Sequence, residues 1–145
     1  MKTKADVSMT ADLTTMTATE LVAGYRARKF SPVEVVRETL ENIEALNPAL
    51  NAFVYLDVDG ALAAACESEA RWERGEPAGL LDGVPTTMKD LTFVKGWPRY
   101  GGSSTAPAVP APDTFDGPPA ARLRESGAVL LGKTAQPEFA WKGLT

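Results

Sequence analysis

The stretch AARLRESGAVLL, residues 120–131, decides the fold class. Its first part, residues 120–126, is typical of a short helix, and Gly127 is a natural residue to end that helix. The continuous apolar run at 128–131 is typical of a strand that is covered on both faces. Another short strand is predicted at 84–88, before a long loop rich in glycine and proline. Strand, long connection, helix and strand make a βαβ crossover in a parallel sheet, so the sequence predicts an α/β protein.

Upstream of this crossover the sequence predicts mostly helices. Residues 17–20 and 31–34 are capping boxes, in which a hydroxyl accepts from the third helical N–H and a glutamate reaches back. Asn47-Pro48 is expected to end the second helix, because the residue before a proline disfavours the helical conformation. A short strand or extended link is expected at 51–56 and a third helix at 59–74. The helical first half is therefore expected to be followed by strands and loops.

The composition fits a single domain of ordinary size. The chain has 145 residues, of which 44% are hydrophobic, and this apolar fraction is too high for a disordered chain. Its net charge of −4 argues against a nucleic-acid partner, whose binding depends on phosphate neutralisation. No window approaches the roughly 18 consecutive apolar residues of a membrane span, and the first residues lack a signal-peptide core. No membrane partner and a cytoplasmic location are therefore expected.

The absence of certain residue types limits the chemistry of this chain. It contains no histidine, which excludes a Ser-His-Asp triad, a Cys-His dyad and a histidine-ligated metal built from these residues. Its one cysteine, Cys66, excludes an internal disulfide, and its place on an apolar helical stripe predicts a core position. Acid–base chemistry must therefore use Lys, Asp, Glu or Tyr.

Lys89 is the candidate for that chemistry. It follows the predicted strand at 84–88 and precedes Asp90. A lysine at the end of an interior strand is expected to be partly desolvated, which favours the neutral amine that a general base needs. The alternative is a lysine whose stem covers apolar surface and whose amine reaches solvent, as in most lysines. Because side chains alternate along a strand, Lys89 and Asp90 need not meet.

The same segment resembles a known family. Residues 81–91, LDGVPTTMKDL, are similar to the G-[IV]-P-x-x-x-K-D segment of the amidase signature family. Further stretches keep the order and spacing of that family, namely SPVEV at 31–35, VKGWP at 94–98, ARLRESGAVLLGKT at 121–134 and PEFA at 137–140. Each piece is weak alone, but together they make a strong resemblance that covers residues 18–145.

The resemblance implies an amide hydrolase with a Ser–cis-Ser–Lys triad. Lys89 would be the catalytic base that takes a proton from the bridging serine. That serine would activate the nucleophilic serine, which attacks the carbonyl carbon and forms an acyl-enzyme. The family fold is a mixed β-sheet flanked by helices, and no metal or organic cofactor is implied. The implied partner is a small-molecule amide substrate, with a homodimer as an option for the full-length form.

The resemblance also implies that this chain is part of a larger amidase domain. Residues 1–17 are expected to be a flexible N-terminus. Residues 18–145 are expected to be the N-terminal portion of a single domain, truncated before the serine-rich catalytic segment of the family. Ser103 and Ser104 imitate that segment but follow Lys89 too closely, so they are interpreted as loop residues. With one triad member of three, this chain alone is expected to be inactive.

Several departures and alternatives stay open. Ala135 stands where the family usually has asparagine, and Trp141 is either a substrate-facing aromatic or a buried structural residue. The amidotransferase subunit that amidates misacylated tRNA shares many of these motifs but tends to carry K-D-N and D-E-F-A. K-D-L at 89–91 and P-E-F-A at 137–140 therefore favour a stand-alone amidase. A non-catalytic remnant, or a split half that needs a partner, is expected to expose apolar surface around 128–131.

Overall fold

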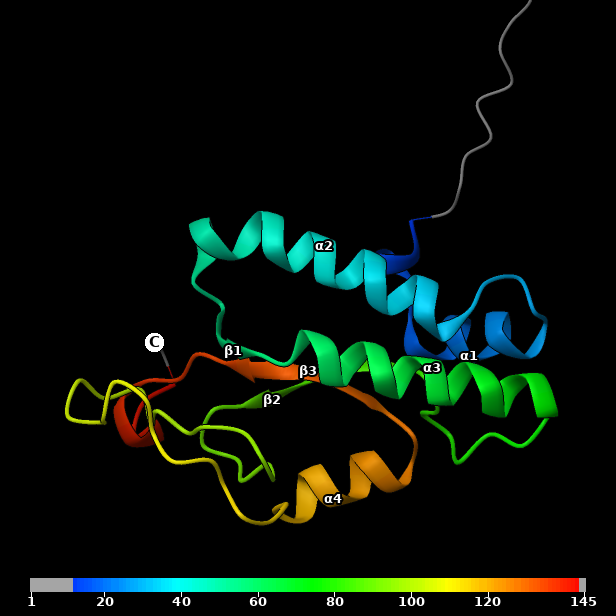
Figure 1. The fold of residues 1–145 in the computed structure, drawn as a ribbon. Coiled ribbons are helices and arrows are strands. Elements are labelled where there is room, and N and C mark those ends of the chain that lie inside the picture. The colour runs from blue at the N-terminus through cyan, green and yellow to red at the C-terminus, as the bar shows by residue number, and fades with distance from the viewer. Residues whose placement is uncertain (1–11, 144–145) are drawn as a thin grey trace, which may run out of the picture.

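A computed structural model describes residues 12–143 of the chain. In chain order the elements are η1 (Leu13–Thr15), α1 (Ala18–Arg26), α2 (Pro32–Leu50), β1 (Phe53–Leu56), α3 (Val58–Arg74), β2 (Pro85–Lys89), α4 (Pro118–Glu125), β3 (Val129–Thr134) and η2 (Glu138–Ala140). Helices α2 and α3 lie over one face of a small sheet and α4 lies over the other (Figure 1). The α/β class and the helical first half are confirmed. Over the described range, no helix is both long enough and apolar enough to cross a membrane.

Within the described residues, the sheet has three strands in the order β1-β3-β2. β2 and β3 run parallel and α4 lies between them in the chain, which confirms the predicted βαβ crossover. β1 pairs with the other side of β3 in the antiparallel sense, so the sheet is mixed. The central strand is β3, and its residues from Val129 to Lys133 are buried, as the continuous apolar run predicted.

Two apolar clusters cover the two faces of β3. The cluster on the side of α2 and α3 contains Val36, Leu40, Ala61, Ala65, Val129 and Leu131. The cluster on the side of α4 contains Met88, Val94, Trp97, Ala120 and Leu130. Residues 128–131 are no more than 7% exposed, so the apolar surface that a remnant or split half was expected to expose there is not exposed. The physical reason is that β1 and β2 flank β3 while helices cover both of its faces.

Helix α2 continues through Pro48 to Leu50, so the prediction that Asn47-Pro48 ends this helix is wrong. Pro48 lies in the last turn, where its missing N–H removes one hydrogen bond without dividing a long helix. The Asn47 side chain donates to the carbonyl of Phe53 at 3.2 Å and accepts from the N–H of Phe53 at 2.8 Å. The helix ends at Asn51, whose left-handed φ of 50° suits asparagine.

The local signals for helix ends are otherwise confirmed. Both predicted capping boxes form at the starts of α1 and α2. Helix α3 begins after its N-cap Asp57 and ends at Gly75, which has a left-handed φ of 74°. The core position predicted for Cys66 is wrong, because Cys66 is exposed. The buried stripe of α3 is formed instead by Ala61, Ala65 and Ser68.

Residues 12–17 are the described part of the segment expected to be a flexible N-terminus. Asp12 caps η1, and the N–H of Leu13 donates to the Glu38 carboxylate on α2 at 3.2 Å. Leu13 and Met16 pack against the cluster formed by α1 and α2. The other residues of that expectation, 1–11, lie outside the described range.

A β-bulge sets the direction of side chains at the end of β3. The register of β3 against β2 shifts by one residue between Leu130 and Lys133. Because side chains alternate along a strand, the extra residue places Lys133 on the same face as Leu130, toward α4 and its preceding loop. Gly132 lies within the bulge, where a Cβ would come 2.2 Å from the Tyr55 carbonyl oxygen on β1.

Candidate active site

Lys89 is the last residue of β2, and its side chain is exposed. Its Nζ donates a hydrogen bond to the carbonyl oxygen of Ala135, just beyond the end of β3. The prediction of a partly desolvated lysine on an interior strand is wrong for this structure. Within residues 12–143, β2 pairs only with β3, so its other edge is open. The preceding residue, Met88, takes the buried position.

The carboxyl ends of β2 and β3 meet at one edge of the sheet. Lys89 pairs with Thr134, and the N–H of Asp90 donates to the Thr134 carbonyl at 3.1 Å. In open α/β sheets, ligands bind outside the carboxyl ends of parallel strands. Lys89 therefore lies at the edge of the sheet where chemistry is expected.

Two completely buried charged residues lie at the same edge. They are Lys133, near the end of β3, and Asp90, directly after β2. The Lys133 Nζ is 3.3 Å from Oδ2 of Asp113, in the loop that precedes α4. Asp90 accepts a hydrogen bond from the N–H of Tyr100 at 3.0 Å through Oδ1. Burial lowers the pKa of Lys133, while the carboxylates of Asp113 and Asp90 act in the opposite direction.

The sequence pattern does not single out Lys133 or Asp113 as site residues. One feature of the sequence does indicate that Lys133 is buried, because this lysine follows a continuous apolar run within one strand. A buried lysine needs a buried counter-charge. The loop that supplies this counter-charge carries no local pattern that would identify Asp113.

A glycine turn packs against the segment that follows β3. Gly101 and Gly102 have left-handed φ values of 67° and 64°. A Cβ on Gly102 would lie 2.4 Å from the Gln136 carbonyl oxygen, so only glycine fits there. The carbonyl of Gly101 accepts from the N–H of Phe139 at 2.8 Å. These contacts hold residues 136–139 beside the carboxyl end of β2.

Ser103 and Ser104 lie in the loop after this turn, as predicted. The Ser103 hydroxyl donates to Oε1 of Glu138 at 2.6 Å and lies 2.8 Å from the Thr105 hydroxyl. In the part of the chain that the structure describes, no hydrogen bond joins Ser103 to Lys89. Ser103 therefore ties the loop to the PEFA segment.

Trp141 follows η2 and is 70% exposed, so it is not a buried structural residue. The Lys142 ammonium lies 4.4 Å from the centre of its indole ring. Phe139 is also exposed. Phe139 and Ala140 have φ values of 47° and 58°, and residues with side chains are strained in this region. The turn therefore exposes two aromatic side chains, four and six residues after Ala135 in the chain.

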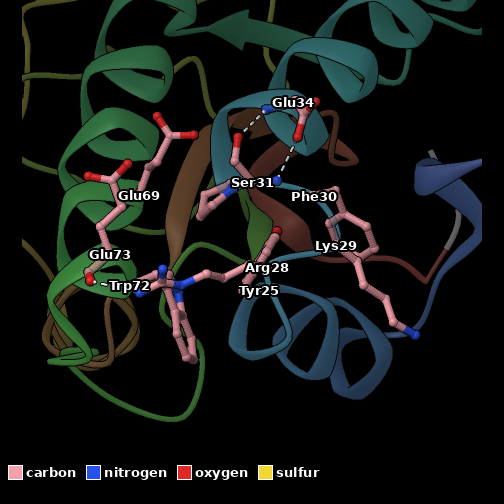
Figure 2. A pocket seen from close by; sticks show the side chains of 10 residues that line it. Tyr25, Arg28, Lys29, Phe30, Ser31, Glu34, Glu69, Trp72 and Glu73 are labelled. Atoms are coloured by element: carbon pink, nitrogen blue, oxygen red, sulfur yellow. Dashed lines mark hydrogen bonds between the residues drawn. The ribbon is translucent and has the colours of Figure 1, made fainter.

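A separate pocket of about 280 Å³ lies between α3 and the turn that joins α1 to α2 (Figure 2). The Arg28 guanidinium spans it and donates to the carbonyl of Glu73 at 3.1 Å. The hydroxyl of Tyr25 donates to the carbonyl of Gly83 at 3.0 Å, and burial raises the pKa of that hydroxyl. Because Gly83 precedes β2, this pocket lies at the opposite end of the strand from Lys89. It does not belong to the candidate active site.

Comparison with known proteins gives consistent matches. The family model named Amidase matches residues 34–145. A glutamyl-tRNA(Gln) amidotransferase subunit from Acidothermus cellulolyticus is 42% identical over 130 residues, which are 90% of this chain and 25% of that protein. The acylamidase of Rhodococcus erythropolis is 36% identical over 130 residues, which are 90% of this chain and 27% of that protein. The chain thus spans about a quarter of the length of these relatives.

Solved structures agree with the sequence relatives. A bacterial aryl acylamidase of the amidase signature family is 33% identical with a TM-score of 0.81, covering 92% of this chain and 28% of that one. The peptide amidase from Stenotrophomonas maltophilia is 30% identical with a TM-score of 0.78, covering 86% of this chain and 26% of that one. By its family match, its fold and the motif around Lys89, this chain belongs to the amidase signature family.

Proposed function

We propose that this chain contributes Lys89 as the catalytic base of an enzyme that hydrolyses small amides. The observation that carries the proposal is the position of Lys89. Its amine lies at the carboxyl edge of two parallel strands and is directed by the Ala135 carbonyl. A lysine suits this task in a chain that contains no histidine. The enzyme is proposed to act in the cytoplasm on a small-molecule amide, with a homodimer as the option for its full-length form.

The proposed reaction uses the Ser–cis-Ser–Lys triad of the family. The neutral amine of Lys89 takes the proton of a bridging serine, which takes the proton of the nucleophilic serine as that serine attacks the amide carbon. The leaving amine receives a proton as the carbon–nitrogen bond breaks. Water then cleaves the acyl-serine ester, releases the acid and restores the serine. Both serines are proposed to lie outside residues 1–145, so this chain alone is expected to be inactive.

The open edge of β2 supports this arrangement. Lys89 is exposed there, so serines from another part of the protein can reach its amine. Protein packed against this edge would remove the amine from water, which disfavours the ammonium and favours the neutral base. Lys89 is exposed in this chain, whereas a general base must be neutral. Both statements hold if further protein covers β2 in the complete enzyme.

Trp141 is proposed to contact the substrate. Its ring is 70% exposed and it follows the segment whose Ala135 carbonyl binds Lys89. An exposed aromatic ring offers apolar area to the acyl or aryl group of an amide. Trp141→Ala is therefore expected to raise KM while leaving the free energy of unfolding unchanged.

A second candidate is the catalytic component of a glutamyl-tRNA(Gln) amidotransferase, which amidates misacylated tRNA. The 42% identity to the amidotransferase protein of Acidothermus cellulolyticus favours it. The K-D-L and P-E-F-A motifs favour a stand-alone amidase. The candidates differ in their need for partners, because a stand-alone enzyme hydrolyses amides by itself. A split half would also need a partner, which would have to carry the two serines.

The test uses the complete gene product, assayed alone on small arylamides. Lys89→Ala is expected to lower kcat about 1,000-fold, and Lys89→Arg equally, since arginine does not deprotonate. Lys95→Ala is the matched control, because Lys95 is an exposed loop lysine. Full activity in a folded Lys89→Ala variant would overturn the assignment. Activity that appears only with added partner proteins would favour the second candidate or a split enzyme.

A further inference from the structure

A buried ion pair lies close to the proposed base. Lys133 is completely buried, and lysines are almost never fully buried unless they are paired. Its Nζ lies 3.3 Å from Oδ2 of Asp113, at the long end of hydrogen-bond distances. The pair is present because the bulge in β3 turns Lys133 toward the loop that precedes α4.

Asp113 has other groups that satisfy its charge. Its carboxylate accepts from the N–H of Val94 at 3.2 Å and lies 3.4 Å from Nε of Arg99. Arg99 is a second cation for this carboxylate. Asp113 would therefore keep a counter-charge if Lys133 were neutral.

Asp90 is in the opposite situation. Its side chain is completely buried and its Oδ1 accepts from the N–H of Tyr100. Its Oδ2 is buried and has no hydrogen-bond partner among the described residues. A buried carboxylate of this kind needs a counter-charge. Lys133 is the neighbouring buried cation: it pairs with Met88, two residues before Asp90, and the Asp90 N–H donates to the next residue, Thr134. Burial lowers the pKa of Lys133, whereas the carboxylates of Asp113 and Asp90 favour its charged form.

Both Asp90 and Lys133 are joined to Lys89 through the backbone. Asp90 follows Lys89 directly, and its N–H donates to the carbonyl of Thr134. Ala135, which accepts the hydrogen bond from Lys89, follows shortly after Lys133 in the chain. A displacement of either segment would move Lys89 or its acceptor.

We propose that Lys133 is a positioning residue, whose buried charge acts through Asp90 to hold Lys89 in place at the edge of the sheet. This inference rests on the proposed function, in which Lys89 is the base. Because Lys133 is completely buried, it does not touch the substrate. The competing explanation is that Lys133 only docks the loop through Asp113.

Two double variants separate these explanations. Lys133→Met keeps the length of the side chain but leaves Asp90 without a counter-charge, while Arg99 still serves Asp113. Adding Asp90→Asn removes the uncompensated charge and is expected to restore the site. Adding Asp113→Asn is not expected to restore it. If Lys133 only docks the loop, Asp113→Asn is expected to restore the site and Asp90→Asn is not, because the interaction energy would then be between Lys133 and Asp113.

The first measurement reports the position of Lys89 itself. The complete protein is treated with a limiting amount of acetic anhydride, and acetylation of Lys89 is compared with that of Lys95 by mass spectrometry. Lys89 is expected to react more slowly than Lys95, because in the complete protein its amine is hydrogen-bonded and covered by the protein packed against β2, which restricts access of the reagent. The ratio of Lys89 acetylation to Lys95 acetylation is expected to rise toward one in Lys133→Met. Adding Asp90→Asn is expected to return this ratio to its wild-type value. This readout needs no activity, so it tests the inference even where Lys89→Ala disproves the proposed function.

The second measurement separates kcat from KM. Lys133→Met is expected to lower kcat about 100-fold with little change in KM, as for a misplaced catalytic group. Lys133→Arg is expected to retain most of the activity, because it keeps the charge. Where Lys133→Met does not fold, the two double variants and Lys133→Arg carry the comparison. The inference is overturned if Asp113→Asn, rather than Asp90→Asn, rescues Lys133→Met. It is also overturned if the acetylation ratio is unchanged in folded Lys133→Met.

Discussion

The amine of Lys89 donates a hydrogen bond to the carbonyl oxygen of Ala135, across the carboxyl ends of two parallel strands. Because the acceptor is a main-chain carbonyl, this hydrogen bond does not depend on which side chain residue 135 carries. The alanine that stands where the family usually has asparagine therefore leaves this contact intact. The position of the base depends instead on the register of β3, which the bulge at Gly132 helps to set.

Gly132→Ala is expected to destabilise the sheet. The added Cβ would lie 2.2 Å from the Tyr55 carbonyl oxygen, a distance that forces β1 and β3 apart. Overpacking of this kind costs about 1–3 kcal/mol of unfolding free energy. Urea unfolding measures the change. Gly143→Ala is the matched control, since its Cβ would meet nothing within 4 Å, and equal stability of the two variants would contradict the packing argument.

Arg71→Met is expected to lower the free energy of unfolding by about 3 kcal/mol at neutral pH. Arg71 donates to both carboxylate oxygens of Asp82, at 2.9 and 2.7 Å, and the Asp82 side chain is completely buried. Removing the guanidinium leaves a buried charge without its partner. Arg74→Met is the control, because Arg74 and Glu76 form a pair in which both side chains are largely exposed. A cost no larger than that of the control would contradict the prediction.

The stabilisation by Asp82 is expected to depend on pH. Burial by itself raises the pKa of the Asp82 carboxyl, but hydrogen bonds from Arg71 and the Ala78 N–H outweigh it and hold the pKa below its ordinary value. A lowered folded-state pKa stabilises the protein above the unfolded pKa of about 3.9, and this contribution is lost as the pH falls further. The difference between wild type and Arg71→Met should therefore shrink in urea unfolding below about pH 4. A constant difference down to pH 3 would rule out this linkage.

Features that depend on neighbouring residues could be predicted from the sequence. The capping boxes at Thr17 and Ser31 and the helix end at Gly75 each involve residues within one turn. The central strand is predictable because the continuous apolar run at 128–131 needs cover on both faces. Lys89 is identifiable because its motif is local.

Features that depend on distant residues could not be predicted. Helix α2 passes Pro48 because the Asn47 side chain bonds to Phe53 on the next strand. Lys89 is exposed because the described elements leave its face of β2 uncovered, while Met88 on the other face is buried. The cover of a strand face is not a local property. The burial of Lys133 follows from a bulge and from Asp113 in a loop, neither of which the strand pattern reveals.

Asn47→Ala is expected to lower the free energy of unfolding by about 1–2 kcal/mol. The variant loses both hydrogen bonds to Phe53, and these bonds connect α2 to β1. Asn42→Ala on the same helix is the matched control, because Asn42 is exposed and, among residues 12–143, its side chain donates only to the Thr14 hydroxyl at 3.1 Å. Both variants replace asparagine by alanine within α2, so their difference in urea unfolding measures the hydrogen bonds to β1. Equal stability would show that this tie contributes nothing.

Ser103→Ala is expected to separate a loop serine from a catalytic one. The Ser103 hydroxyl donates to Glu138 at 2.6 Å and thereby connects the glycine turn to the PEFA segment. Its loss removes exposed hydrogen bonds to Glu138 and Thr105. The kcat of the complete protein should therefore stay within about tenfold, compared with about 1,000-fold for Lys89→Ala. Ser104→Ala is the control for a serine without that bond. A loss in Ser103→Ala as large as that in Lys89→Ala would place a triad serine in this chain and refute the proposal that both serines lie outside it.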